Sequence, residues 1–401
     1  MKKIISLICM TLMCIHMIYP INAYTLSSQY AYVYDPDTQL VYLDVKSNDK
    51  IYPASMTKIV TLMCALDKIE DLQQEVQITY EDIEGLYEAN ASVCGFSANE
   101  IVSVEDLLYG VLLPSGADAC NALARITYGS CDALVDAMNK KVQDLNLKNT
   151  HFTNVTGLHD DNHYTTCYDM SRLLENALQN KQFKDVFETR SYTSSSKAYT
   201  WLSSLKRGEL SLNRDTDCID GGKSGFTYEA RLTYASSMTV DHHKLICIVA
   251  DADYNQSNSH INDTLNIYHD INDRYHNVNV FNENDVLQKL KIKKTKYKDY
   301  DYCIDKSISL LLEKQYNKDD LNITINIQDD LVAPIQENTR IGELIIEDNQ
   351  KVLLQYDLFI HETIKPDFIG LTIYYSPYII AVTLALTVII IIKKQKNKNM
   401  G

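Results

Sequence analysis

Basic residues are scarce in this chain. Lysine and arginine number 38 against 53 aspartates and glutamates, which gives a formal net charge of −15. Proteins that bind nucleic acid need clustered basic side chains to contact phosphates, so this balance argues against a nucleic-acid partner. One basic stretch lies at residues 289–298, where Leu290 and Ile292 alternate with lysines. The alternation favours the solvated face of a β-strand over a binding patch.

Cysteines spaced as metal ligands are also lacking. The chain has ten cysteines, but no C-x-x-C pair and no histidine at ligand spacing, so we expect no zinc site. Outside the cell some cysteines could pair, for example Cys120 with Cys131, although the sequence does not define the connectivity. Cys64 and Cys247 lie in apolar runs, which favours small buried thiols there.

The two ends predict export and a membrane anchor. Residues 1–23 combine a basic start, an uncharged run and a small residue at a plausible cleavage point, which is typical of a signal peptide. Residues 371–392 are long and apolar enough to form a transmembrane helix, and the lysine-rich tail 393–401 favours the cytoplasm. We therefore expect the sequence between them to lie outside the membrane. An uncleaved anchor at the first end and a buried core helix at the second are the alternatives.

The sequence between these ends, about 345 residues, is more than one compact domain usually holds. Residues 24–276 mix strand-like runs with long helical patterns, which predicts an α/β (α+β) domain with a mixed sheet and a helical cluster. Residues 277–365 have short alternating segments, which predict a small all-β domain. The clearest predicted helices are 104–113, 118–128 and 131–145, and the clearest strands are 30–34, 244–250, 322–327, 341–346 and 352–356.

A serine and a lysine stand three residues apart at the start of an apolar, helix-compatible run. Ser55 and Lys58 belong to the segment 53–58, and the run continues through 59–66. On a helix these two positions share a face, so the Lys58 amine can reach the Ser55 hydroxyl. Serine needs an adjacent base to act as a nucleophile, and lysine can be that base only if burial or a nearby cation lowers its pKa. The pair therefore predicts nucleophilic catalysis only if other residues of a site lie beside it.

The spacing alone is not specific, because it recurs in polar, loop-like sequence at Ser47-x-x-Lys50, Ser194-x-x-Lys197 and Ser203-x-x-Lys206. Two further segments carry residues that could form a site with Ser55. Ser115, within 112–118, lies between two helical patterns, where its hydroxyl could relay a proton or could simply cap a helix.

The other segment, 220–227, opens a strand and is rich in glycine. Gly222 and Gly225 predict a close approach of substrate to this backbone. A lysine and two hydroxyls could then hold a carboxylate, and the alternative is a glycine-rich turn with a solvated lysine. The side chains concerned are Lys223, Ser224 and Thr227.

In this order the three segments resemble the signature of penicillin-recognising serine peptidases. They are most similar to the low-molecular-mass penicillin-binding proteins that are D-alanyl-D-alanine carboxypeptidases, and the flanks 103–110, 154–160 and 163–166 share this likeness. The resemblance implies a penicillin-binding/β-lactamase-like serine acyltransferase domain, followed by the family's β-rich second domain. It also implies removal of the terminal D-alanine from peptidoglycan stem pentapeptides at the extracytoplasmic face of a bacterial cell membrane.

The resemblance assigns a role to each residue. Ser55 would be the acyl-ester nucleophile, Lys58 the general base and Ser115 the proton relay. The backbone N–H of Phe226 would join that of Ser55 in the oxyanion hole. Substrate would be bound by Lys223, Ser224 and Thr227. No metal or organic cofactor is implied, and β-lactams are implied as covalent inhibitors.

The chain departs from the family pattern in three places. Ala117 stands where relatives commonly carry asparagine, and Ser224 replaces a more usual threonine. A transmembrane span replaces the more common amphipathic tail. A literal Ser-Ala-Asn at 97–99 lies upstream of the segment that leads into the second motif, and we interpret it as a coincidence.

Other functions share these residues. A D,D-endopeptidase or transpeptidase would use the same catalytic groups on the same peptides. A protein that senses β-lactams or binds the wall without turnover is the alternative from another class, and Ala117 is its only support. A β-lactamase is disfavoured, because residues 154–170 have no Glu-x-x-x-Asn element to place a deacylating carboxylate.

Overall fold

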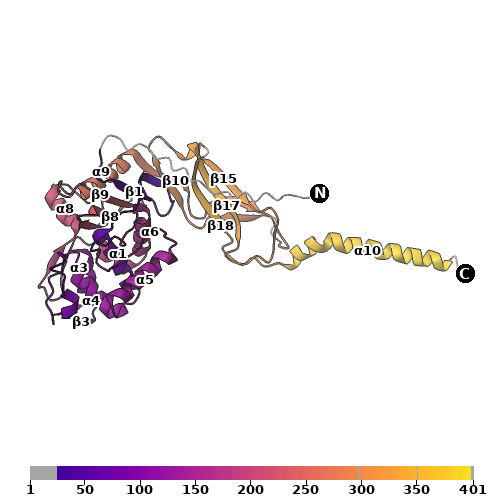
Figure 1. Cartoon of the computed structure of the whole chain (residues 1–401). Coiled ribbons are helices and arrows are strands. Elements are labelled where there is room, and N and C mark those ends of the chain that lie inside the picture. Colours follow the sequence, from indigo (N-terminus) through magenta and orange to yellow (C-terminus); the bar gives the residue numbers. More distant parts are fainter. Residues whose placement is uncertain (1–24, 297–298, 350, 399–401) are drawn as a thin grey trace, which may run out of the picture. The chain divides into compact units, whose positions relative to one another are not determined.

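The structure is a computed structural model that describes residues 25–296, 299–349 and 351–398 (Figure 1). The predicted signal peptide, 1–23, lies outside the described residues. Contacts divide the chain into two compact units, the first ending at Tyr275 and the second beginning at His276.

A five-stranded sheet in the order β2-β1-β9-β8-β7 forms the centre of the first unit. All four pairings are antiparallel, so the expectation of a mixed sheet is wrong in this respect. The reason is local: β1–β2, β7–β8 and β8–β9 are joined by short turns, which impose antiparallel pairing. The strands are β1 Tyr30–Tyr34, β2 Val41–Val45, β7 Gly221–Thr227, β8 Arg231–Val240 and β9 His243–Ala252.

Helices cover both faces of this sheet (Figure 1). Helix α9 packs on β8 and β9, and α6 packs against β1 and β9. Helix α1 is buried at every residue and contacts α3, α4, α5 and α6. The helices of the unit are η1 Ala54–Met56, α1 Thr57–Leu66, α2 Tyr80–Ile83, α3 Val104–Leu112, α4 Ala117–Tyr128, α5 Cys131–Asp144, α6 Cys167–Leu178, α7 Lys181–Glu188, α8 Ser204–Leu212 and α9 Ser259–Arg274. Two small hairpins complete it: β3 Glu75–Gln77 with β4 Ile101–Ser103, and β5 Ser191–Thr193 with β6 Thr200–Leu202.

The three helices predicted in the middle of the unit match α3, α4 and α5, and their ends follow from capping. Ser103 begins α3 by accepting a hydrogen bond from the N–H of Asp106. Gly129 ends α4 with φ +85°, a left-handed conformation that glycine adopts without strain, and Ser130 caps the start of α5. Helices α4 and α5, joined by this short connection, contact each other and α1.

The second unit is built of strands, as predicted. Its three-stranded antiparallel sheet, β15-β17-β18, contains the segments expected at 322–327, 341–346 and 352–356. Ile341, Leu344 and Leu358 of this sheet are fully buried, as is Leu310 on β14. The elements are β10 Tyr275–Phe281, β11 Val286–Leu290, β12 Ile292–Lys293, β13 Tyr300–Cys303, β14 Ile308–Glu313, η2 Lys318–Asp320, β15 Asn322–Ile327, β16 Leu331–Val332, β17 Arg340–Asp348 and β18 Lys351–Phe359.

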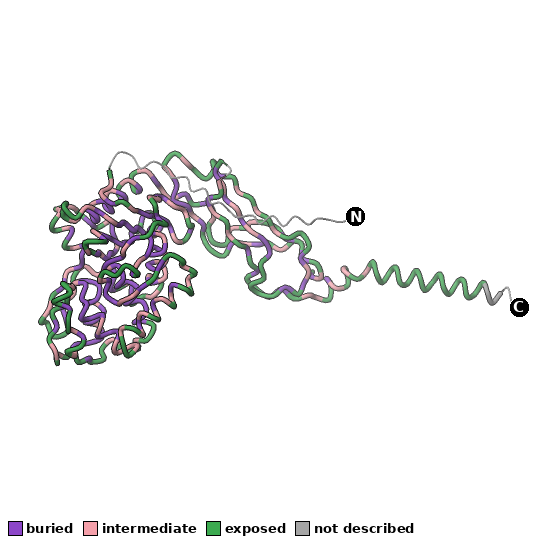
Figure 2. Tube along the Cα trace, viewed as in Figure 1, coloured by how far each residue is buried: buried purple, intermediate pink, exposed green. Residues whose placement is uncertain are grey.

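A long apolar helix, α10 Phe368–Lys398, follows the β-strands. Residues 368–395 are long and apolar enough to cross a membrane, and none of the most apolar window is buried inside the protein. Figure 2 shows this exposure along the length of the helix. Such a helix is consistent with a membrane anchor, because its apolar side chains have no protein core to pack against.

The eight described cysteines are all free thiols, so the pairing of Cys120 with Cys131 does not occur. Cys120 is fully buried on α4, and Cys131 begins α5. Cys64 and Cys247 are buried as predicted. Among the described residues, no group of three histidine, cysteine or acidic side chains is placed to hold a metal ion.

Candidate active site

Ser55 lies in the short 3-10 turn η1, which leads directly into α1. Ala54 and Met56 on either side of it are buried, whereas Ser55 is partly exposed. Ala54 has φ +46°, a left-handed conformation that costs a non-glycine residue energy and is frequent at functional sites. The turn therefore presents the hydroxyl of Ser55 at the N-terminal end of a buried helix.

Lys58 reaches Ser55 from the first turn of α1. Its Nζ donates to Ser55 Oγ at 3.1 Å and to the carbonyl oxygen of Thr156 at 2.5 Å. The side chain is 2% exposed, and this burial lowers the pKa of the Lys58 amine. A buried amine of lowered pKa can be neutral, and a neutral amine can accept the proton of a serine hydroxyl.

Ser115 and Lys223 form a second pair beside the first. Lys223 Nζ donates to Ser115 Oγ at 2.9 Å and to the carbonyl oxygen of Ser224 at 2.8 Å. Lys223 is 1% exposed, and burial together with the cations of Lys58 and Arg207 holds its pKa well below the usual value. Ser115 has φ +67°, so the connection between α3 and α4 is also held in a left-handed conformation.

Strand β7 carries Lys223 at the edge of the five-stranded sheet. A Cβ atom added to Gly225 would lie 2.7 Å from the backbone nitrogen of Ser55, and one added to Gly222 would lie 2.0 Å from the hydroxyl oxygen of Tyr234. The glycines therefore make room for the protein's own atoms, and the close approach of substrate to this backbone stays a prediction. Gly225 brings β7 and the Ser55 turn into contact.

The remaining predicted residues follow on β7. Ser224 is partly buried, and the side chain of Phe226 is 45% exposed. Thr227 accepts a hydrogen bond from the N–H of Ala230 at 3.1 Å, so its hydroxyl also shapes the turn into β8. Gly225 lies against the backbone nitrogen of Ser55, and Phe226 is the next residue along β7.

Two residues that the sequence did not reveal hold these parts in place. His163 Nε2 lies 2.7 Å from Thr57 Oγ1, and His163 Nδ1 accepts from the N–H of Thr153. Burial lowers the pKa of His163 to about 4, so the ring is neutral near pH 7 and donates from Nε2. The Thr57 hydroxyl in turn donates to the carbonyl oxygen of Ala54. His163 lies in the flank 163–166, but its contact with the Ser55 turn depends on folding.

Asp118 is the other such residue, one position after Ala117. Its buried carboxylate accepts backbone N–H bonds from Cys94 at 2.8 Å and Gly95 at 3.2 Å. The backbone N–H of Ala117 donates to the carbonyl oxygen of Ser92. Ala117 itself is 1% exposed and brings no polar side chain to the site. Together these bonds join segment 92–96 to the start of α4, next to Ser115.

Gly157 is the tightest backbone contact behind Ser55. It has φ +84°, and an added Cβ would lie 1.9 Å from the carbonyl oxygen of Ala54. We expect Gly157→Ala to lower the free energy of unfolding by about 2–4 kcal/mol, from strain plus the clash, and to displace the Ser55 turn. Gly129→Ala is the matched control, because Gly129 has φ +85° and open space around it.

Thermal unfolding and the rate of labelling by a fluorescent penicillin measure the two effects. The control should lose some stability and keep its labelling rate. Equal stability and equal labelling in both variants would show that the contact with Ala54 does not shape the site.

The other Ser-x-x-Lys pairs have structural roles. Ser203 caps α8 by accepting from the N–H of Lys206, and Lys206 forms an ion pair with Glu209. Lys50 Nζ donates to the carbonyl oxygen of Asp161. None of these contacts is between a serine hydroxyl and the lysine amine of its own pair.

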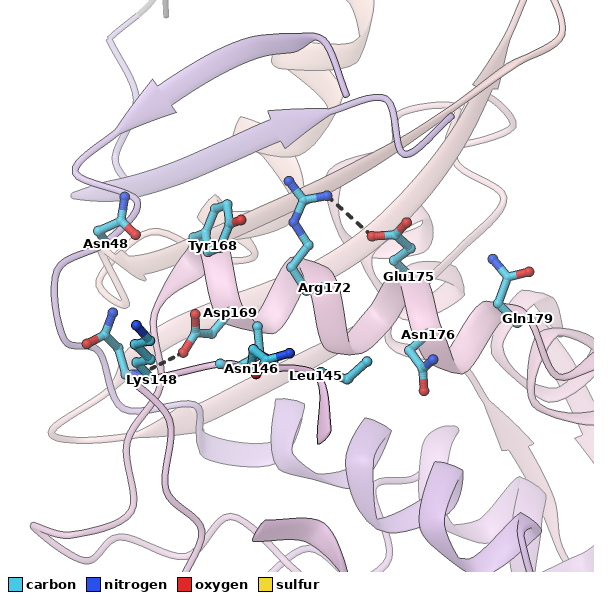
Figure 3. A pocket seen from close by; sticks show the side chains of 12 residues that line it. Asn48, Leu145, Asn146, Lys148, Tyr168, Asp169, Arg172, Glu175, Asn176 and Gln179 are labelled. Carbon is cyan, nitrogen blue, oxygen red and sulfur yellow. Dashed lines mark hydrogen bonds and ion pairs between the residues drawn. The ribbon is translucent and has the colours of Figure 1, made fainter. Parts of the chain in front are cut away.

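A pocket of about 540 Å³ lies elsewhere in this unit, between α6 and the segment 145–149 (Figure 3). Asn48, just after the edge strand β2, also lines it, whereas Ser55 lies against β7 at the opposite edge of the sheet. Arg172 in its wall is ion-paired with Glu175. No member of the Ser55, Lys58, Ser115 and Lys223 cluster lines this pocket.

Comparisons with known proteins agree with this geometry. The family model Peptidase_S11, D-alanyl-D-alanine carboxypeptidase, matches residues 19–254, and the model PBP5_C, penicillin-binding protein 5 C-terminal domain, matches residues 275–366. The D-alanyl-D-alanine carboxypeptidase DacF of Bacillus subtilis is 28% identical over 339 residues, covering 84% of this chain and 85% of DacF.

Solved structures share the fold. Penicillin binding protein 5 from Haemophilus influenzae superposes with a TM-score of 0.74 at 21% identity, over 86% of this chain and all of that one. The Streptomyces K15 DD-transpeptidase superposes with a TM-score of 0.56 at 24% identity, over 62% of this chain and 97% of that one. The chain belongs to the peptidase S11 family and is a penicillin-binding serine D-Ala-D-Ala carboxypeptidase that acts on peptidoglycan.

Proposed function

We propose that this chain removes the terminal D-alanine from stem pentapeptides through an acyl-enzyme on Ser55. The observation that carries the proposal is the pair of buried amines, each hydrogen-bonded to a serine hydroxyl: Lys58 to Ser55 and Lys223 to Ser115. Burying two lysine amines costs folding free energy, and titratable groups perturbed in this way cluster at functional sites.

In the acylation step, Ser55 Oγ attacks the carbonyl carbon of the D-Ala-D-Ala bond while neutral Lys58 takes the hydroxyl proton. The C–N bond of the tetrahedral intermediate then breaks, Ser115 gives its hydroxyl proton to the departing amine of D-alanine, and the protonated Lys58 returns a proton to Ser115. A water molecule later attacks the acyl ester and regenerates Ser55. A β-lactam would acylate the same oxygen, and its ring-opened ester would hydrolyse slowly.

Lys223 would receive the substrate's terminal carboxylate, with the hydroxyls of Ser224 and Thr227. Burial and neighbouring cations lower the pKa of Lys223 in the free protein. An arriving carboxylate reverses this effect, because an opposite charge favours the ammonium form. Substrate binding would thus charge Lys223 and leave Lys58 as the neutral base.

The backbone N–H groups of Ser55 and Phe226 would stabilise the tetrahedral oxyanion. The contact of Gly225 with the nitrogen of Ser55 supports this role, because it brings the two backbone segments together. Donors fixed in this way contribute about 3–4 kcal/mol each in comparable enzymes. The exposed side chain of Phe226 takes no part in it.

We propose a catalytic domain at 24–276 and a β-rich domain at 277–365, outside the cell membrane. The signal peptide 1–23, the span 371–392 and the lysine-rich tail 393–401 support this topology. The enzyme would then work at the extracytoplasmic face of a bacterial membrane, tethered within reach of newly made wall.

Analysis of products separates this activity from its alternatives. The full chain in detergent is incubated with a stem pentapeptide, and free D-alanine, tetrapeptide and cross-linked dimer are measured. We expect D-alanine and tetrapeptide in equal amounts. Dimer in place of tetrapeptide would favour a transpeptidase, and cleavage of purified dimers an endopeptidase. Penicillin labelling without D-alanine release would favour a β-lactam sensor.

A further inference from the structure

Lysines gather around the base of α10, although the chain as a whole carries a net charge of −15. Lys291, Lys294 and Lys296 lie in the segment that follows β11, and Lys365 lies three residues before the helix begins. Lys291, Lys296 and Lys365 are exposed, and Lys294 is partly exposed. We call these four residues the lysine collar.

Contacts within the second unit place the collar beside the first turns of α10. The N–H of Asp367 donates to the carbonyl oxygen of Lys294 at 3.0 Å. A Cβ added to Gly370 would lie 2.2 Å from the carbonyl carbon of Lys294, so helix and segment are in direct contact. The Lys294 amine lies 4.9 Å from the ring centre of Tyr374 and 5.8 Å from that of Tyr375.

The same turns carry exposed aromatic and apolar side chains. Phe368 is 84% exposed, Ile369 56% and Tyr378 64%. Tyrosine and other amphipathic side chains concentrate where a membrane helix passes through the headgroup layer. If residues 371–392 span the membrane, the collar therefore lies at the height of the lipid headgroups.

Acidic neighbours account for part of this positive charge, but not for that of Lys291 and Lys365. Lys293, next to the collar, is held by Asp330 at 2.6 Å. Asp367 accepts from the backbone N–H of Gly370, where it caps α10, and from the backbone N–H of Lys296 in the collar. Among the described residues, neither Lys291 nor Lys365 has a carboxylate within ion-pairing distance. Long lysine side chains can extend to place their amines at phosphates.

We propose that the lysine collar binds the phosphates of anionic phospholipids around the base of the span. The proposal rests on the membrane topology proposed above, and its ligand class follows from charge complementarity. It also revises one expectation. Leu290 and Ile292 are buried and Lys291 between them is exposed, as a solvated strand face requires, but the segment lies against the anchor rather than in free solvent.

Lipid retention by the full chain tests the proposal. The protein in nonionic detergent micelles with equal amounts of phosphatidylglycerol and phosphatidylcholine is measured by native mass spectrometry. We expect about fivefold more bound phosphatidylglycerol than phosphatidylcholine, with the preference falling as salt rises. The variant K291Q/K294Q/K296Q/K365Q should retain both lipids equally and still release D-alanine.

A matched control, K140Q/K148Q/K181Q/K197Q, removes the same charge from exposed lysines of the first unit and should keep the preference. Equal retention of both lipids by the unmodified chain, or an unchanged preference in the collar variant, would overturn the proposal. Displacement of the lipid by millimolar inorganic phosphate would mean a site for free phosphate instead. Failure of the unmodified chain to release D-alanine would count against the proposed function. Failure of that chain to sediment with membranes would count against the proposed topology.

Discussion

Lys58→Met should slow the acylation of Ser55 by about 10³-fold, both by penicillin and by stem pentapeptide. Methionine fills the buried space of the lysine stem but cannot accept the Ser55 proton. Stopped-flow labelling with a fluorescent penicillin gives the acylation rate, and D-alanine release gives turnover. Lys50→Met is the matched control, because Lys50 has the same spacing to Ser47 but donates to a backbone carbonyl at the surface.

Lys58→Met should also change the pH dependence of the acylation rate. Since the base must be neutral, the acylation rate should rise with pH through the pKa of Lys58 and then level off. Burial lowers that pKa, so the rise should finish below the range of an ordinary lysine. The rising limb should be absent in Lys58→Met. An unchanged pH profile in that variant would show that another group takes the proton.

The second large effect concerns Lys223. Lys223→Gln should lower kcat/KM for a stem pentapeptide by about 10²–10³-fold, because the substrate carboxylate loses its buried cation. Glutamine can still donate to Ser115, so the relay hydroxyl keeps a partner. Steady-state release of D-alanine measures the loss.

A substrate with an amidated C-terminus separates binding of the carboxylate from other roles of Lys223. The unmodified enzyme should prefer the free carboxylate strongly, and Lys223→Gln should show little preference between the two peptides. If the variant still prefers the free acid by the same factor, the carboxylate is bound elsewhere. Circular dichroism of both proteins checks that the fold is kept.

Local patterns in the sequence were enough to predict several of the helices and strands. Apolar spacing predicted α3, α4 and α5, and alternation predicted β15, β17 and β18, because each pattern reflects one buried face. The order of the strands in the sheet could not be predicted in this way. β1 pairs with β9 across more than 200 residues of sequence, as Tyr32 opposite Ile248 illustrates, and no local pattern encodes that partner.

In the candidate site, too, contacts between residues near in sequence were predictable and contacts between distant residues were not. Lys58 lies one helical turn from Ser55 at the start of an apolar helical run, so their contact could be predicted from the spacing together with that run. The bond between Lys223 and Ser115 joins residues 108 positions apart, and no local pattern in the sequence predicts it. The supports His163 and Asp118 were missed because a lone histidine or aspartate carries no local signal. Their roles come from contacts with Thr57 and with the backbone of Cys94.

The central claim is that Ser55 forms the acyl ester. Its most direct test is mass spectrometry of the full chain after brief exposure to benzylpenicillin, followed by proteolysis and mapping of the adduct. We expect one penicilloyl group, on the peptide that contains Ser55, and none on Ser55→Ala, which should also release no D-alanine. An adduct on Ser115 or another residue, or D-alanine release by Ser55→Ala, would contradict this account.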